Sequence, residues 1–175
     1  MMKKTVVALI AGMAFGSSVY AESAPGDNKF LGLEVGAATV QGDTFTELGH
    51  EGDAVEYGVR LGAQTEEWRT MFSFDYFDSS DDDQNVEKGL LTVDYFIYNS
   101  GTEMSVRPFI GLNIGYANYE STAIDDSGFL YGGQAGVVIG ITPQIDLDIS
   151  YRYSLSEMDV MDHTGSIVFG FNYLF

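Results

Sequence analysis

The last nine residues of the chain carry one continuous apolar face with a period of two. Every second position from Ile167 to Phe175 is apolar or aromatic, whereas the positions between them include Gly170 and Asn172. A period of two is the period of a β-strand, in which successive side chains point to opposite faces. The continuous apolar face predicts a strand that turns one side toward something other than water.

Seven further segments show the same alternation. The alternation itself covers 7–11 residues in each segment, close to the length of about 9–11 residues that a tilted strand needs to cross a bilayer. The sequence therefore predicts an all-β protein, an eight-stranded antiparallel up-and-down transmembrane β-barrel. Before the terminal strand, the alternating segments occupy residues 31–37, 55–64, 68–76, 91–97, 106–116, 134–141 and 145–153.

The connections between these segments alternate in length. Long polar connections follow the odd segments and tight turns follow the even ones, as expected of a meander whose two ends differ. In outer-membrane barrels the short turns lie in the periplasm and the long loops outside. An even strand number then places both termini on the periplasmic side. The long connections cover residues 41–53, 78–85, 120–127 and 155–163, and the turns cover 65–66, 99–101 and 142–144.

The first 21 residues are typical of a secretory signal peptide. Lys3 and Lys4 precede an apolar run that is too short to span a membrane, and Val19 and Ala21 supply the small residues that a signal peptidase reads. We expect cleavage after Ala21, so residues 1–21 form the signal peptide and residues 22–175 form one barrel domain.

Charge and composition exclude several classes of function. Beyond Ala21 the chain has six basic residues against 26 acidic ones, a formal charge of −20. Such an acidic protein is not expected to bind nucleic acid through its phosphates. The chain has no cysteine, so neither disulfides nor thiolate metal sites are available. We predict no cofactor and no metal site.

The polar face of the predicted strands carries many charged side chains among glycines. In a barrel of eight strands the interior is only wide enough for its own side chains, so these charges would pair and fill it. A gated ion path through the same network is the alternative. The predicted interior network consists of Glu34, Glu56, Arg60, Arg69, Asp75, Asp94, Arg107, Asp146, Asp148 and Arg152.

Aromatic residues gather near the ends of the apolar faces. Trp68 and Tyr76 are eight positions apart, about 26 Å along a strand, which suits two aromatic belts on either side of an aliphatic band. A soluble barrel of the lipocalin kind would place its apolar face inside instead. Small and charged residues together would make an unusual water-facing surface, so we favour the membrane barrel. The predicted belts contain Trp68, Tyr76, Tyr116, Tyr151, Tyr153, Tyr173 and Phe175.

The chain resembles the superfamily of small eight-stranded outer-membrane proteins that includes the OmpA transmembrane domain, OmpX and its attachment-protein relatives, and the opacity-type surface proteins. The resemblance covers nearly all of residues 28–175 and is carried by residues 107–116 and 165–175. It implies a location in the outer membrane of a Gram-negative bacterium. It also implies that the outer-membrane assembly machinery reads the C-terminal strand with its terminal Phe175.

The predicted outer loops are all acidic. Clustered carboxylates attract hard divalent cations, which could bridge the loops to lipopolysaccharide phosphates. No segment matches a calcium-binding loop, so a solvated, repelling surface is the simpler interpretation. A host or surface ligand is a further candidate partner, and we expect a monomer. The acidic loop residues include Asp81, Asp82, Asp83, Asp125, Asp126, Asp159 and Asp162.

Three functional hypotheses follow. The leading one is a structural or surface-interaction protein, in adhesion or resistance, with a plugged interior. The second is a narrow porin-like ion channel. The third is a lipid-modifying barrel enzyme, for which His163 and Ser166 would be candidates. Their odd separation in a strand sends them to opposite faces, and His50 falls in a long loop, so we predict no enzymatic activity.

Overall fold

The computed structural model describes residues 28–41, 52–79, 84–97, 106–120, 125–158 and 161–175. The described chain folds into eight strands of 12 to 18 residues, and it contains no helix that is long and apolar enough to cross a membrane. The strands are β1 (Asn28–Gln41), β2 (Gly52–Gln64), β3 (Trp68–Ser79), β4 (Gln84–Phe96), β5 (Val106–Glu120), β6 (Asp125–Thr142), β7 (Ile145–Ser156) and β8 (His163–Leu174).

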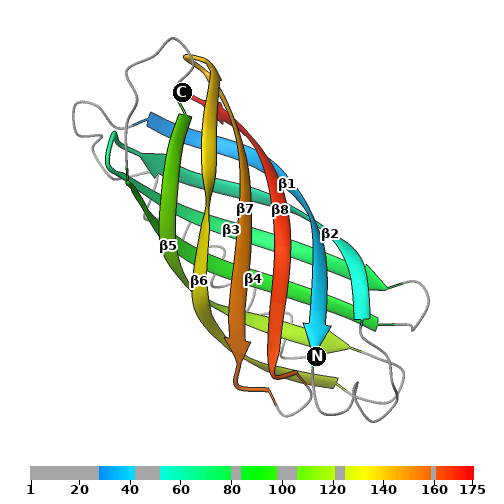
Figure 1. The fold of residues 1–175 in the computed structure, drawn as a ribbon. Coiled ribbons are helices and arrows are strands. Elements are labelled where there is room, and N and C mark those ends of the chain that lie inside the picture. The colour runs from blue at the N-terminus through cyan, green and yellow to red at the C-terminus, as the bar shows by residue number, and fades with distance from the viewer. Residues whose placement is uncertain (1–27, 42–51, 80–83, 98–105, 121–124, 159–160) are drawn as a thin grey trace.

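The eight strands form one closed antiparallel barrel in which each strand pairs with its neighbours in sequence (Figure 1). β8 returns to β1, with Phe30 opposite Leu174 and Gln41 opposite His163. The last residue also takes part in this closure, because Phe175 N–H donates to the Lys29 carbonyl at 2.8 Å. Closure leaves no sheet edge, which is the condition for strands to cross a bilayer. The prediction of an eight-stranded up-and-down barrel is confirmed.

The two ends of the barrel differ. Short turns at residues 65–67 and 143–144 lie at the same end as Phe175, and we call this the turn end (Figure 1). In the first of these turns, Thr65 Oγ1 accepts from the backbone N–H groups of Glu67 and Trp68 at 3.2 and 3.0 Å. The opposite end, where β1 ends and β8 begins, is the loop end.

Several strands are longer than the sequence predicted. β4 begins at Gln84 instead of residue 91, and β6 begins at Asp125 instead of residue 134. The reason is that polar residues and glycines replace the apolar alternation near the loop end, for example Glu87 and Gly89 in β4. There the strands continue because their backbones remain paired, as in the ladder of β5 and β6 up to Glu120 and Asp125.

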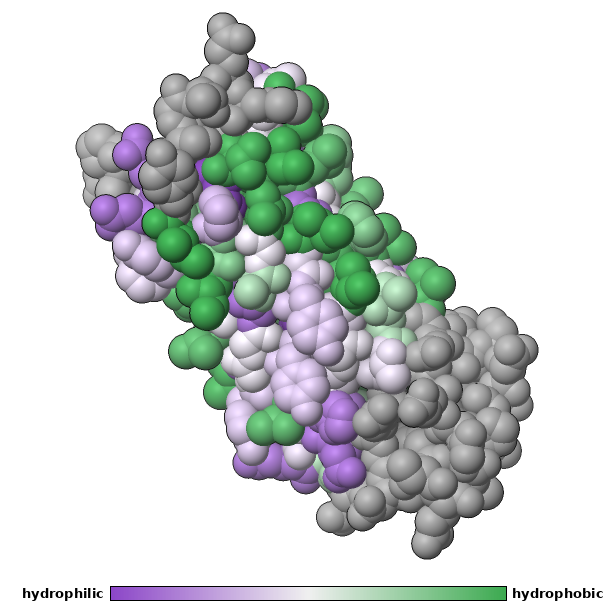
Figure 2. All heavy atoms as spheres, in the orientation of Figure 1, coloured by the Kyte–Doolittle hydropathy of each residue, from purple (hydrophilic) through white to green (hydrophobic). Residues whose placement is uncertain are grey.

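Successive side chains alternate between a buried inner face and an exposed outer face. Figure 2 shows hydrophobic residues over much of the outer face toward the viewer. Leu112 is 75% exposed and Ile149 is 41% exposed, whereas Asn113 and Ser150, their sequence neighbours, are buried. A water-soluble barrel has the opposite arrangement, so this pattern fits a wall that faces lipid.

Candidate functional site

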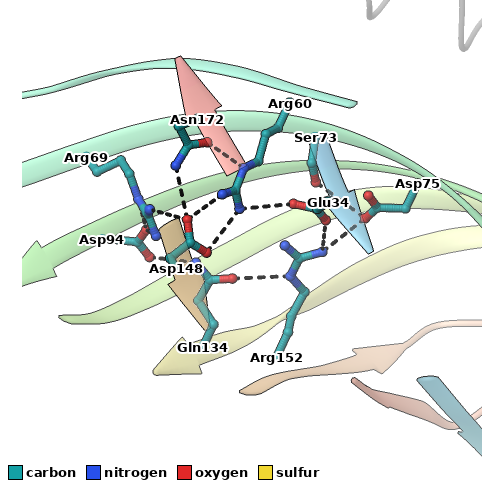
Figure 3. Close-up of polar contacts among 10 residues, drawn as sticks. All are labelled: Glu34, Arg60, Arg69, Ser73, Asp75, Asp94, Gln134, Asp148, Arg152 and Asn172. Atoms are coloured by element: carbon teal, nitrogen blue, oxygen red, sulfur yellow. Dashed lines mark hydrogen bonds and ion pairs between the residues drawn. The ribbon is translucent and has the colours of Figure 1, made fainter. Parts of the chain in front are cut away.

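Arg60 lies at the centre of the barrel interior and is contacted from three other strands (Figure 3). Its guanidinium pairs with Glu34 of β1 at 3.3 Å and with Asp148 of β7. Its Nε donates to Asn172 Oδ1 of β8 at 2.8 Å. Asn172 in turn donates to Asp148 Oδ2 at 3.1 Å. One side chain thus ties together β1, β2, β7 and β8.

Arg69 forms a second centre on β3. Its Nε donates to Asp94 Oδ2 of β4 at 2.8 Å, and its Nη1 lies 3.3 Å from Asp148. The other oxygen of Asp94 accepts from Gln134 Nε2 of β6 at 2.8 Å. Because Asp148 contacts both Arg60 and Arg69, the two centres belong to one network.

Arg152 extends this network toward the loop end. Its Nη1 lies 3.0 Å from both Glu34 and Asp75, and its Nε donates to Gln134 Oε1 at 3.2 Å. Glu34 therefore bridges Arg152 and Arg60, as Figure 3 shows. The connected side chains come from every strand except β5, and Asn113 of β5 joins β7 separately by accepting from Ser154 Oγ at 2.8 Å.

Two further ion pairs lie on either side of this network. Arg107 pairs with Asp146 at 3.1 Å on the turn-end side, where Gln64 also donates to Asp146 at 2.7 Å. Lys88 pairs with Glu56 on the loop-end side. All ten residues of the sequence-predicted network lie on the inner face, and each carboxylate or guanidinium has an ion-pair partner within the described chain.

Lys88 is the cation that the sequence analysis missed. Its side chain points to the inner face, as do those of Thr92 and Asp94, four and six residues later in β4. The period of two from Asp94 back to Lys88 was the available signal. Glu87 and Gly89 on either side hid it, because neither is apolar. With Lys88 included, the described interior carries six carboxylates and five cationic side chains.

Two glycines make room for the paired side chains. A Cβ at Gly170 would collide with the guanidinium of Arg60, and a Cβ at Gly111 would collide with the carboxylate of Asp94. Neither position could carry a larger residue without moving an ion pair. At these two glycines, a charged side chain from another strand occupies the space that a larger residue would need.

An apolar layer closes the turn end of the interior. Phe96 and Phe109 meet edge to face, with ring centroids 6.4 Å apart, and pack with Val138. The guanidinium of Arg107 lies 4.3 Å from the Phe96 centroid, and that of Arg69 lies 4.5 Å from the Phe109 centroid. Cation–π contacts of this kind connect the charged network to the apolar layer. A second buried cluster at this end contains Phe30, Met71 and Leu174.

A larger apolar layer closes the loop end. Met158 and Met161, from the connection between β7 and β8, are buried against residues of the barrel mouth. The connection is held down because Ser156 N–H donates to Asp162 O at 2.8 Å and Glu157 N–H donates to Phe129 O at 3.0 Å. The wall residues of this cluster are Ala38, Phe77, Val86, Leu90, Ala117, Tyr119 and Leu130.

The predicted aromatic-belt residues all lie on the outer face. Trp68, Tyr173 and Phe175 lie toward the turn end, where the Trp68 ring meets Tyr95 at 4.9 Å between centroids. Tyr76, Tyr116 and Tyr153 lie toward the loop end, and Tyr151 lies between the two groups. The Tyr116 hydroxyl donates to Ser127 Oγ at 2.8 Å, which orients its ring.

Only part of the predicted acidic surface belongs to the described residues. Asp81, Asp82, Asp83 and Asp159 lie outside them, as does His50. Asp125 begins β6, and Asp126 is half-buried and accepts from Ser127 N–H at 2.7 Å. Asp162 is exposed. Within the described ranges, no group of three or more His, Cys, Asp and Glu residues is arranged to hold a metal ion.

The two candidate catalytic residues lie on different faces of β8. Ser166 is buried inside the barrel, whereas the His163 ring packs 5.3 Å from the Tyr153 ring on the outer face. A nucleophile and its base must lie within hydrogen-bond reach. This pair therefore offers no such arrangement.

Known proteins share this architecture. The model of the outer membrane protein beta-barrel domain matches residues 7–175. Neisserial surface protein A is similar in structure, with a TM-score of 0.68 at 16% identity over 86% of this chain and 99% of that one. OprH of Pseudomonas aeruginosa gives 0.60 at 18% identity over 85% and 99%. No curated protein sequence matches the chain significantly.

Ail, the attachment invasion locus protein of Yersinia pestis, is also similar. Its TM-score is 0.53 at 18% identity, over 86% of this chain and 99% of Ail. Ail has also been solved in complex with the heparin analogue sucrose octasulfate. Identities this low show a shared fold, and a shared fold does not imply that this chain binds the ligands of the three relatives.

Proposed function

The chain belongs to the outer membrane protein β-barrel domain family, whose members reside in the bacterial outer membrane, and we propose that it is a non-conducting barrel with its loop end facing outward. The observation that carries the proposal is the filled interior. Arg60, Arg69 and Arg152 link seven strands across the lumen, and apolar layers lie on both sides of them. The role of a barrel without a channel is then structural, or lies in interactions at the cell surface.

Charge distribution supports a particular kind of surface interaction. Of the six basic residues beyond Lys4, five point into the barrel and Lys29 lies at the turn end. The outward-facing loop end therefore carries acidic residues without lysine or arginine. We propose that it contacts lipopolysaccharide through bridging divalent cations, or a cationic surface or host ligand. A polyanion such as the one bound to Ail would be repelled, so the two proteins would differ in partner.

The remaining proposals concern assembly and chemistry. The terminal strand with Phe175 is the segment that we propose the outer-membrane assembly machinery reads. We also propose that the barrel is monomeric and has no catalytic role, which the separation of His163 and Ser166 onto different faces supports. The signal peptide at residues 1–21 remains a prediction, because it lies outside the described residues.

Single-channel recording in a planar bilayer tests the closed interior. The purified, refolded protein should give no large, steady conductance, because water and ions would have to displace paired charges in a lumen of eight strands. A folded barrel is verified first by its altered gel mobility in cold SDS. A stable pore that disappears when Arg107 or Asp148 is replaced would instead establish the narrow channel.

A further inference from the structure

The buried charges of the barrel interior do not balance, and the imbalance lies on one side. Toward the turn end three carboxylates lie among three arginines, namely Asp94, Asp146 and Asp148 among Arg60, Arg69 and Arg107. Toward the loop end three carboxylates lie among two cations, namely Glu34, Glu56 and Asp75 among Lys88 and Arg152. A buried charge that lacks a partner tends to become neutral. The loop-end half is therefore where one further positive charge is required.

Two of the three loop-end carboxylates have partners that hold them as anions. Both oxygens of Glu34 accept from guanidinium groups, Oε1 from Arg152 at 3.0 Å and Oε2 from Arg60 at 3.3 Å. Glu56 pairs with the ammonium group of Lys88. The excess negative charge therefore falls on the third carboxylate.

That third carboxylate, Asp75, is paired less completely. Its Oδ2 shares Nη1 of Arg152 with Glu34 and lies 3.4 Å from Ser73 Oγ (Figure 3). Its Oδ1 is buried and has no hydrogen-bond partner among the described residues, although Lys88 lies directly opposite Asp75 in the β-ladder. Half of this carboxyl group thus lacks the contacts that a buried anion needs.

The carboxyl groups of Asp75 and Glu34 also lie within hydrogen-bond reach of each other. An ionised carboxylate can only accept a hydrogen bond, so a bond between two carboxyl groups needs a proton on one of them. Two carboxylates that share one site do not both ionise readily. The contact and the charge count therefore indicate the same proton.

The strands around Asp75 supply no further cation to replace this proton. On β2, the residue opposite Asp75 is Gly58, at which a Cβ would collide with Asp75 Oδ1. On β5, β6 and β8, the buried side chains of the described chain include no charged one. The charged groups of the loop-end half around Asp75 are Glu34 of β1, Glu56 of β2, Lys88 of β4 and Arg152 of β7.

We propose that Asp75 is a neutral carboxylic acid in the closed barrel and donates its proton to Glu34. The five remaining carboxylates then balance the five cations of the interior. A neutral interior does not draw cations in from the loop end, whereas an ionised Asp75 would attract them. The inference rests on the closed interior proposed above, and it adds a bound proton as one of the groups that keep the interior closed.

Infrared spectroscopy of the folded barrel in lipid vesicles at neutral pH tests the proposal directly. The wild type should show the carbonyl band of a protonated carboxyl group, and Asp75→Asn should lose it. Asp162→Asn is the control, because Asp162 is exposed and its carboxylate is ionised in water. This variant should keep the band. Glu34→Gln should also lose it, because Asp75 can then ionise and take Arg152 as its own partner.

Urea unfolding from the same vesicles gives a second measurement. Asp75→Asn should leave the urea midpoint no lower than that of the wild type, because the amide has the shape of the neutral acid and can donate to Glu34. Asp148→Asn makes the same substitution in the balanced half, where Arg60 and Arg69 both use the carboxylate. It should lower the midpoint. Equal losses in the two variants would show that Asp75 is an anion like Asp148.

The absence of the carbonyl band from the folded wild type overturns the proposal without any variant. A band that persists in Asp75→Asn or in Glu34→Gln overturns the assignment to Asp75. Should Asp75→Asn not fold by cold-SDS mobility, the wild type and Glu34→Gln still decide. Conductance is recorded separately: a wild type without the band and without a pore refutes this inference alone, and a wild type with the band and a stable pore refutes the non-conducting barrel alone.

Discussion

The inner and outer faces of the same strands follow opposite rules. In β7, Asp146, Asp148 and Arg152 are buried and hydrogen-bonded, whereas Leu147 and Ile149 between them are exposed. Inside, each charge depends on a partner from another strand. Outside, apolar side chains need only the hydrocarbon around them. The inner face is therefore specified by pairs of residues, and the outer face by single residues.

This contrast predicts the largest effect for a change that removes a charge from the centre of the inner network. Arg60→Met removes one of the two arginine partners of Glu34, which keeps Arg152, and one of the two of Asp148, which keeps Arg69, while retaining much of the side-chain volume. Removing one member of a buried pair typically costs about 3–5 kcal/mol. Urea unfolding from lipid bilayers, followed by the fluorescence of Trp68, the single tryptophan, measures the loss.

The matched control for Arg60→Met is Lys29→Met at the turn end, where no ion pair is formed with the described residues of the inner network. It should change the unfolding free energy by less than about 0.5 kcal/mol. Equal losses in the two variants would mean that the interior network contributes nothing specific to stability, and the contrast between the two faces would fail.

A charge on the outer face should have the next largest effect. Leu112→Arg places a guanidinium on the lipid side of β5, where Leu112 is 75% exposed. Near the bilayer midplane this substitution costs about 2–4 kcal/mol. Glu66→Arg, in the exposed turn after β2, should be tolerated because it stays in water. If both variants fold into lipid equally well, the assignment of inner and outer faces is reversed.

The difference between the faces also explains what the sequence could predict. Alternation is a property of single residues in order, so it predicted the eight strands, the closed barrel and the side of the wall on which Arg69 or Leu112 lies. Partner choice depends on register between strands, and no local pattern encodes it. The link from Glu34 to both Arg60 and Arg152 joins residues up to 118 positions apart.

Two other features escaped the sequence for related reasons. Lys88 lies where outer-face polarity hides the alternation, because its exposed neighbour Glu87 is charged instead of apolar. Met158 and Met161 were counted with an acidic loop, although they are buried in the apolar layer of the loop end. Isolated methionines carry no periodic signal. Only the folded connection after β7 shows that they close the barrel mouth.

Two glycines offer the finest comparison of the faces. A Cβ at Gly170 would meet the guanidinium of Arg60 inside the barrel, whereas a Cβ at Gly89 on the outer face would meet only Phe72 Cζ at 3.6 Å. Gly170→Ala should therefore destabilise the barrel by about 1–3 kcal/mol, the usual cost of overpacking. Gly89→Ala should stay within about 0.5 kcal/mol of the wild type. Urea unfolding monitored by the fluorescence of Trp68 measures both changes in the free energy of unfolding.

A variant that combines Gly170→Ala with Arg60→Met should lose less stability than the sum of the two single changes, because the methyl group then has no guanidinium to displace. Strict additivity would show that Gly170 is constrained by the backbone and not by the ion pair, and the view that inner glycines exist to house charged side chains would have to be given up.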